Sequence, residues 1–187
     1  MSTAPLEQAI EAAKSVLAGV KADQLGASTP CASWKVSELV NHIVGGQHFF
    51  ASMAKGESPS DAAAPDFSAG DFNASFAQAA AASVAAFQVP GTMDKVLNLP
   101  WGAMPGSAFV GLAAVDTFAH SWDLARATGQ STDLNPELAA ELLVGSRAGI
   151  APEFRGADGV APFGPEQAAP AGASRADELA AFLGRTI

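Results

Sequence analysis

Residues 107–129 read SAFVGLAAVDTFAHSWDLARATG, and this stretch predicts a long helix from about Ser107 to about Ala127. Gly129 follows it as a natural helix stop. At helical spacing, one stripe of this helix begins apolar and then becomes ionisable on the same face. The stripe consists of Phe109, Leu112, Asp116, His120 and Asp123. The stretch therefore predicts a packed helix that carries reactive side chains on its inward face.

The remaining sequence repeats the helical pattern. Apolar residues recur at steps of three and four after Thr3, which predicts a first helix that ends near Leu25 and Gly26. The same reasoning predicts four more helices, over Val36 to Lys55, Asp71 to Gln88, Pro136 to Gly149, and Ser174 to Gly184. Alanine, the best helix former, is abundant. We therefore predict an all-α fold.

Two segments depart from this pattern. Val96, Leu97 and Leu99 predict a short extended piece, followed by a turn at residues 100–102, and no stretch alternates for long enough to predict a sheet. Residues 151–187 are rich in Pro and Gly and end in the short last helix. We expect a single domain over residues 1–187, with the bundle core in 1–150 and the segment 151–187 packed on it.

Composition excludes several classes of protein. The chain has 187 residues, of which 49% are hydrophobic, and this is enough for one buried core. Its net charge of −9 argues against a nucleic-acid or anionic-membrane surface. A single cysteine excludes an internal disulfide and a Cys-rich zinc site. No signal peptide or membrane span is recognisable, so we expect a cytoplasmic protein.

The ionisable stripe indicates a metal site. Asp116 and His120 are one helical turn apart, so their side chains point to a common spot. His42 lies at the edge of the apolar stripe of the helix over Val36 to Lys55. Together these three residues form a two-His-one-carboxylate set, which zinc, nickel or ferrous iron accepts with open positions for water or substrate. The alternative is a solvated Asp–His pair and a histidine that only packs in the core.

Neighbouring residues have weaker claims to the site. His48 is turned away from the face of His42, and we interpret it as a surface or supporting residue. Cys31 precedes His42 by a distance of about 16 Å if the segment is helical, so we interpret it as a small buried residue unless the connector folds back. Glu38 and Asp123 lie one turn from His42 and His120, and either carboxylate suits support of an imidazole. Trp101 and Trp122 are candidates for a pocket wall, although core packing is the default.

Gly45 and Gly46 interrupt the second predicted helix, at a cost of about 1 kcal/mol each relative to alanine. We interpret them as a point of close approach to another helix. Elsewhere the sequence contains no nucleophile elbow, no Walker A loop, no dinucleotide-binding turn and no H-E-x-x-H zinc motif.

Two signatures identify a family. The first is Thr29-Pro30-Cys31-x-x-Trp34-x-Val36-x-x-Leu39-x-x-His42-x-Val44-Gly45-Gly46, and the second is the run from Asp116 through His120 and Trp122-Asp123 to Gly129. Both resemble the N-terminal domain of mycothiol-dependent maleylpyruvate isomerase, in the DinB-like superfamily. The ending Phe163-Gly164-Pro165 to Gly184-Arg185 is similar to that of uncharacterised actinobacterial members.

This resemblance implies an up-down-down-up four-helix bundle, to which the sequence adds short helices and an irregular C-terminal segment. It also implies a divalent metal, usually zinc, on residues that match His42, Asp116 and His120. The isomerase carries Glu at the position of Asp116, which is a departure in this chain. Relatives use the metal to activate a low-molecular-weight thiol, so mycothiol is the expected cosubstrate.

The sequence is compatible with two functions. The first is a metal-dependent thiol transferase or isomerase. We expect its partners to be a small-molecule thiol and an electrophile, and we expect no binding to nucleic acid or membrane. The second is a non-catalytic metal-binding bundle that serves as a binding or regulatory module. A homodimer stays open in both.

Overall fold

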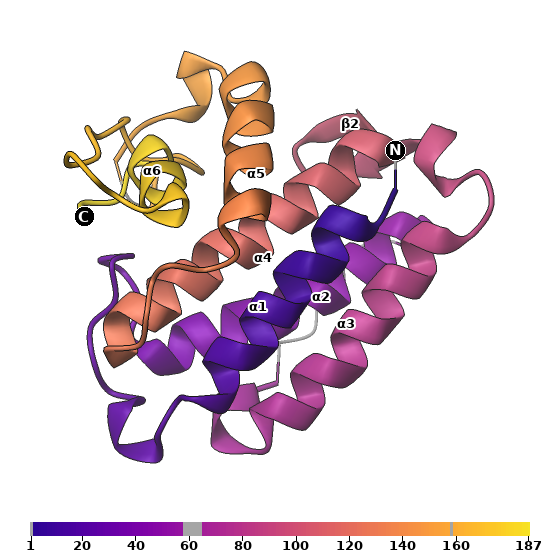
Figure 1. The fold of residues 1–187 in the computed structure, drawn as a ribbon. Helices are drawn as coiled ribbons and strands as arrows, with labels where there is room; N and C mark the ends of the chain where they lie inside the picture. Colours follow the sequence, from indigo (N-terminus) through magenta and orange to yellow (C-terminus); the bar gives the residue numbers. More distant parts are fainter. Residues whose placement is uncertain (1, 58–64, 158) are drawn as a thin grey trace.

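The computed structural model describes residues 2–57, 65–157 and 159–187. Within these ranges the chain is mainly helical, with one small hairpin (Figure 1). The α-helices are α1 (Ala4–Ala18), α2 (Val36–Lys55), α3 (Phe72–Gln88), α4 (Gly106–Thr128), α5 (Pro136–Gly149) and α6 (Arg175–Phe182). The strands are β1 (Val96–Leu99) and β2 (Gly102–Pro105). Short 3-10 turns are η1 (Ala22–Gln24), η2 (Phe67–Ala69), η3 (Thr92–Asp94) and η4 (Pro152–Phe154).

Helices α1 to α4 form a bundle whose helix directions follow from contacts at one end. The ring of Phe109, near the start of α4, lies 5.7 Å from the rings of Phe50 and Phe87, which lie toward the ends of α2 and α3. Helices α2 and α3 therefore run together and opposite to α4. Gln88, at the end of α3, donates to Thr3 Oγ1 at the start of α1 over 3.3 Å, so α1 runs with α4. This up-down-down-up order confirms the predicted fold (Figure 1).

Local signals place most helix ends where the sequence predicts them. Asp71 Oδ1 accepts the backbone N–H of Ala74 at the start of α3, and Ser174 Oγ accepts that of Asp177 at the start of α6. Gly129 ends α4 with a φ of 69°, which a residue with a side chain rarely adopts.

The first helix is shorter than predicted, since α1 ends at Ala18 and not near Leu25. The reason lies at Gly19, where an added Cβ would collide with the side-chain amide of Gln130. Gln130 Nε2 donates to the carbonyl of Val16 over 2.9 Å and caps the last turn. A residue from beyond α4 therefore ends α1, and the local periodicity that continues past Gly19 does not reveal it.

The expectation that the chain has no sheet is wrong for one short segment. The predicted extended piece is β1, and after the predicted turn it pairs with β2 in antiparallel register, Leu97 opposite Met104. Strand β2 has four residues and no β-branched side chain, so it lacks an alternating apolar signal. The hairpin joins the end of α3 to the start of α4 (Figure 1).

The C-terminal segment lies against α4 and α5 (Figure 1). Leu179 and Leu183 are buried in the hydrophobic core that the bundle helices also form. The indole nitrogen of Trp122 on α4 donates to Asp177 Oδ1 on α6 over 2.8 Å. Polar anchors and apolar packing together hold α6 close to the second half of α4.

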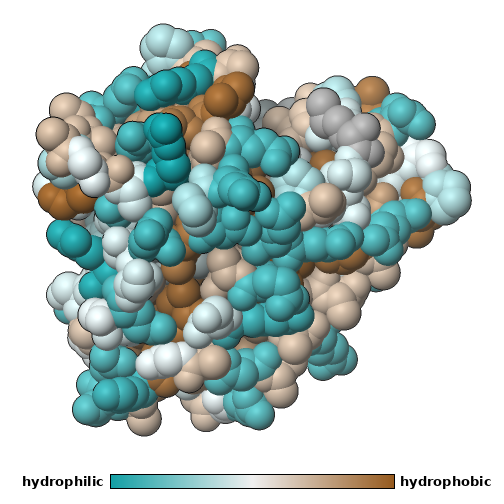
Figure 2. Space-filling view, in the orientation of Figure 1, coloured by the Kyte–Doolittle hydropathy of each residue, from teal (hydrophilic) through white to brown (hydrophobic). Residues whose placement is uncertain are grey.

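The surface follows the helical pattern of buried and exposed faces. In Figure 2, hydrophilic side chains are spread over the visible face among weakly hydrophobic ones, and the most hydrophobic side chains show only in strips and small patches. Among the helices described, none is long and apolar enough to span a bilayer. The apolar content of the chain is therefore placed mainly between helices.

Candidate metal centre

Helices α2 and α4 bring His42, Asp116 and His120 to one point. His42 Nε2 lies 3.4 Å from Asp116 Oδ1, and His120 Nε2 lies 3.5 Å from the same oxygen. All three side chains offer a ligand atom, and these atoms lie within 4.8 Å of one another. The helix pattern predicted this juxtaposition, because Asp116 and His120 are one turn apart and α2 packs against α4.

These distances are long for charge-assisted hydrogen bonds, and they also match the spacing of ligand atoms around one metal ion. A charge-assisted N–H···O bond is about 2.7–2.9 Å long, which is shorter than both contacts. Ligand atoms about 2.0–2.2 Å from a tetrahedral zinc ion lie about 3.3–3.5 Å from one another. Both contacts to Asp116 Oδ1 fall at or near that spacing, at 3.4 and 3.5 Å. The donor set, two imidazoles and a carboxylate, is one that zinc accepts.

The centre is closed on one side and open on another. The ring of Trp34 lies 4.6 Å from the ring of His42 and 5.4 Å from that of His120, so it covers both imidazoles. The side chains of His42 and Asp116 are 32% and 27% exposed, whereas that of His120 is 12% exposed. The centre is therefore more exposed on the side of His42 and Asp116 than on the side of His120.

Asp123 supports His120 from behind. His120 Nδ1 lies 3.0 Å from Asp123 Oδ2, and the side chain of Asp123 is fully buried. Because an ionised carboxylate only accepts hydrogen bonds, this contact assigns the ring hydrogen of His120 to Nδ1 and leaves Nε2 directed toward Asp116. The sequence-based suggestion that Asp123 supports the imidazole of His120 agrees with this contact.

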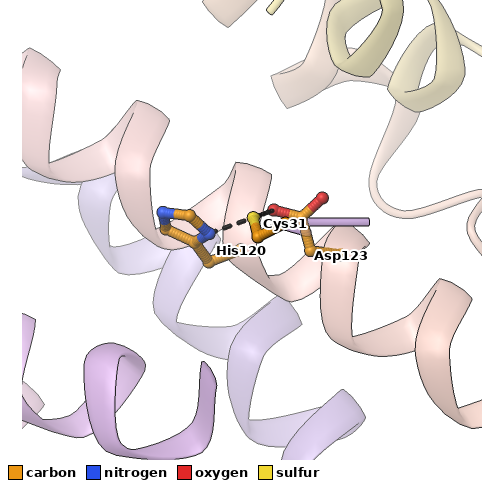
Figure 3. Close-up of side chains that lie close together, drawn as sticks. All are labelled: Cys31, His120 and Asp123. Atoms are coloured by element: carbon orange, nitrogen blue, oxygen red, sulfur yellow. Dashed lines mark hydrogen bonds and ion pairs between the residues drawn. The ribbon is translucent and has the colours of Figure 1, made fainter. Parts of the chain in front are cut away.

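Asp123 has two further partners. Arg185, near the C-terminus, donates to Asp123 Oδ1 from Nε over 3.1 Å and to Oδ2 from Nη2 over 2.8 Å. The thiol of Cys31 donates to Asp123 Oδ2 over 3.3 Å. Figure 3 shows the ring of His120 and the sulfur of Cys31 both next to this carboxylate. Three segments far apart in sequence therefore meet at one buried carboxylate.

Cys31 is partly buried and lies beside Asp123, so the interpretation of it as only a small buried residue is wrong, and the connector does fold back. The connector folds back because the Thr29 hydroxyl accepts the N–H of Cys31, while Ser28 pairs with Lys35 in an isolated bridge. The resulting loop carries Cys31 to Asp123 and Trp34 to the two histidines. The distance of about 16 Å applied only to a helical connector.

The close packing of these charged groups shifts the pKa values of Asp123, Asp116 and His42. Burial alone would raise the pKa of Asp123, but the charge and hydrogen bonds of Arg185 and the hydrogen bond to His120 hold that pKa well below its usual range. Burial also opposes the charge of Asp116, but the two histidines lower its pKa. Burial disfavours protonated His42, but the hydrogen bond and charge of Asp116 raise its pKa. Both carboxyl groups are therefore ionised near neutral pH.

Two groups of described residues have the geometry of a metal site. One is His42, Asp116 and His120, and the other is Cys31, His120 and Asp123. In the second group, Asp123 is already bound at both oxygens, and the guanidinium of Arg185 lies 2.8 Å away. A cation there would face a positive charge and a carboxylate with no free oxygen, whereas none of the described arginines or lysines forms an ion pair with Asp116 in the first group. The arrangement favours the first group as a ligand set.

Other residues considered from the sequence lie outside the centre. His48 is exposed and stacks on Phe67, with ring centroids 5.6 Å apart. Glu38 is exposed and caps the start of α2, since its Oε2 accepts the backbone N–H of Lys35. Trp122 is buried and bonds to Asp177, and Trp101 is 58% exposed next to Phe49. Among the described residues, no ring contact or hydrogen bond joins either tryptophan to the three candidate ligands.

The interpretation of Gly45 and Gly46 as a point of close approach to another helix is wrong for Gly45, whereas Gly46 faces a side chain of α4 at ordinary contact distance. A Cβ at Gly45 would have no atom within 4 Å. A Cβ at Gly46 would lie 3.7 Å from Asp116 Oδ2 and 3.6 Å from the ring of Phe50, which are ordinary contacts. Because Gly46 has no side chain, nothing from this position lies over the second oxygen of Asp116.

Trp34 and Arg185 are the functional residues that the sequence reasoning did not assign. Trp34 stands in the connector shortly before α2, and this position in the sequence hints that it lies near His42. Its contacts with the rings of His42 and His120 depend on how that connector folds. Arg185 is 62 residues from Asp123, and no spacing rule connects them.

Comparisons with known proteins agree with the fold. A family model described as "Mycothiol maleylpyruvate isomerase N-terminal domain" matches residues 6–125. Two relatives from Mycobacterium tuberculosis, "Uncharacterized protein MT0763" (strain CDC 1551 / Oshkosh) and "Uncharacterized protein Rv0738" (strain ATCC 25618 / H37Rv), are each 44% identical over 182 residues. These alignments cover 97% of this chain and 96% of each relative. No solved structure matches the chain significantly.

Proposed function

The chain belongs to the mycothiol maleylpyruvate isomerase N-terminal domain family, and from this premise we propose that it is a metal-dependent thiol transferase or isomerase. The metal is zinc, and nickel or iron are alternatives that the same ligand types accept. The thiol is of the mycothiol type, and the second substrate is a small electrophile. His42, Asp116 and His120 are the ligands.

One observation carries the proposal, namely the spacing of the three side chains. Two imidazole nitrogens lie 3.4 and 3.5 Å from one carboxylate oxygen, which is long for strong ion pairs and compatible with three ligands of one small cation. Buried or half-buried ionisable groups are rarely gathered without a partner that offsets their desolvation. A divalent cation is such a partner for this set.

The chemistry divides between the metal and the chain. A bound divalent cation supplies positive charge that lowers the pKa of a thiol and favours the thiolate near neutral pH. In a transfer reaction the thiol would lose its proton to solvent and its sulfur would bond to an electrophilic carbon. In exchange, that carbon's bond to a halide or epoxide oxygen would break, or the π electron pair of an activated alkene would move to the neighbouring carbon, which takes a proton from solvent. Asp123 holds the ring of His120 in one orientation, and Trp34 keeps water from one side of both imidazoles.

The open side of the centre suits two small substrates. His42 and Asp116 are partly exposed there, and Gly46 adds no side chain over Asp116. Asp116 is one methylene shorter than the glutamate at this position in the isomerase that the chain resembles. We therefore propose the thiol-dependent chemistry without assigning maleylpyruvate as the substrate.

A thiol-consumption assay tests this function. Zinc-loaded protein is incubated with mycothiol and a panel of activated alkenes, epoxides and alkyl halides, and loss of free thiol is followed with time. Asp116→Asn serves as the site variant and His48→Ala as the matched control, since His48 is an exposed histidine outside the centre. We expect at least one electrophile to be consumed by the wild type and the His48 variant, and far more slowly by Asp116→Asn.

Equal rates with and without protein over the whole panel would contradict catalysis. If zinc still bound in that case, the non-catalytic metal-binding module would be the correct function.

A further inference from the structure

The C-terminal end of the chain reaches the candidate metal centre through Arg185. Its side chain is 13% exposed, and it approaches Asp123, which is fully buried. Nε donates to Oδ1 over 3.1 Å and Nη2 to Oδ2 over 2.8 Å, so the guanidinium binds both carboxylate oxygens. Bidentate pairs of this kind fix the orientation of the carboxylate as well as its position.

The oriented carboxylate in turn fixes His120. Asp123 Oδ2 lies 3.0 Å from His120 Nδ1, on the opposite side of the imidazole ring from Nε2 (Figure 3). A hydrogen on Nδ1 leaves the lone pair of Nε2 directed at Asp116 and His42 in the neutral ring. If Asp123 turned, the ring would lose this partner, and either nitrogen could carry the hydrogen.

A fully buried carboxylate needs its counter-ion. An unpaired buried charge costs several kcal/mol, and it relieves this cost by moving, by taking up water or by losing its charge. Arg185 is the cationic side chain that contacts Asp123 among the described residues. Cys31 also donates to Asp123, but a thiol is a weak donor and carries no positive charge.

We propose that Arg185 is a positioning residue of the metal centre. It clamps Asp123, and Asp123 holds His120 as the Nδ1–H tautomer whose Nε2 faces the metal. Arg185 lies outside residues 6–125, the part that matches the family model, so the C-terminal segment completes a centre whose three ligands lie inside that part. This inference rests on the proposed function for the metal, but the tautomer of His120 is defined without metal.

Two measurements on the full chain test the proposal. The first is zinc affinity, by competition with a chromophoric chelator. The second is the tautomer of His120 in metal-free protein, from imidazole nitrogen shifts in a histidine-labelled sample. The variants are Arg185→Gln and Arg185→Lys, and the matched control is Arg175→Gln, since Arg175 is an exposed arginine of α6 that pairs with Glu178.

We expect Arg185→Gln to bind zinc about 10–100-fold more weakly, as is typical when a partner behind a histidine ligand is lost. Its His120 signals should show mixed tautomers, whereas those of the wild type and Arg175→Gln show Nδ1–H alone. Arg185→Lys should fall between, because an ammonium keeps the charge and loses the two-point geometry. Should the glutamine variant not fold, the lysine variant decides by the same two measurements.

Wild-type zinc affinity and an unchanged tautomer in the folded Arg185 variants would overturn the proposal. A wild-type protein that binds no zinc would refute the proposed function instead. The tautomer measurement would still test whether Arg185 orients His120 through Asp123, because that measurement needs no metal.

Discussion

Arg185 and Asp123, which are 62 residues apart in sequence, form a two-point ion pair in which Asp123 is fully buried. The same carboxylate contacts the imidazole of His120 and the thiol of Cys31. This pair links the C-terminal segment and the connector before α2 to the helix that carries two of the three candidate metal ligands. The centre is therefore a product of the whole chain rather than of α2 and α4 alone.

Replacing either histidine should remove the metal and leave the fold. His42→Ala and His120→Ala are both expected to lose bound zinc, because each removes one of three ligands. The helical content should stay, since the apolar faces of the helices provide most of the stability. Elemental analysis and far-UV circular dichroism measure the two effects, with His48→Ala as the control. A variant that unfolds in part but keeps its zinc would show that the histidine is a core residue.

Asp116 distinguishes a ligand from a structural hydrogen-bond acceptor. Asp116→Asn should bind much less zinc, because a neutral amide is a much weaker ligand than a carboxylate. Asp116→Glu should retain zinc, because it keeps the carboxylate that the resembling isomerase has at this position. Zinc content of the two purified variants is the measurement. Wild-type content in both would exclude Asp116 as a ligand.

Two glycines should respond in opposite ways to alanine. Gly45→Ala should stabilise the protein by about 1 kcal/mol, because the residue is inside α2 and its added Cβ meets nothing within 4 Å. Gly184→Ala should destabilise it by more than about 1 kcal/mol, because φ is 101° there and the Cβ would lie 2.5 Å from the Cα of Gly164. Denaturant unfolding measures both, and a shift of the same sign for the two would contradict the packing described.

The attachment of α6 should depend on pH through Asp177. Burial would raise the pKa of Asp177, but hydrogen bonds from Trp122, Ser174 and Thr132 lower it. A lowered pKa means that the carboxylate stabilises the fold fully above the unfolded value of about 3.9 and loses this effect as pH falls below it.

Asp177→Asn keeps an oxygen that accepts from Trp122 and removes the titrating group. The difference in melting temperature between wild type and variant should therefore shrink as the pH falls from about 5 to about 3. A difference that is constant over this range would contradict the assignment.

The sequence predicts the parts of the centre that depend on one helix or on two facing helices. Asp116 and His120 follow from spacing within α4, and His42 follows from its place beside the apolar stripe of α2. The up-down-down-up order required the family resemblance. Periodicity cannot order helices in space, because every amphipathic helix presents the same kind of face.

The remaining parts depend on contacts between segments far apart in the chain. Cys31 and Trp34 reach the centre because a hydroxyl of Thr29 and a two-residue bridge fold the connector back. Helix α1 ends at Ala18, seven residues before the predicted end near Leu25, because Gln130 caps its last turn. Arg185, which follows α6, pairs with Asp123 on α4 because α6 packs against the bundle. No local pattern encodes any of these contacts, so they could not be predicted from spacing.

Whether His42, Asp116 and His120 hold a metal is decided by the zinc content of the native protein, together with titration of zinc into metal-free protein. We expect about one zinc ion per chain, held by His42, Asp116 and His120, as for a site with three protein ligands. The same titration of the His42→Ala variant should show no binding of comparable affinity. Native protein that contains no metal, and metal-free protein that takes up no added zinc, nickel or iron, would contradict the account.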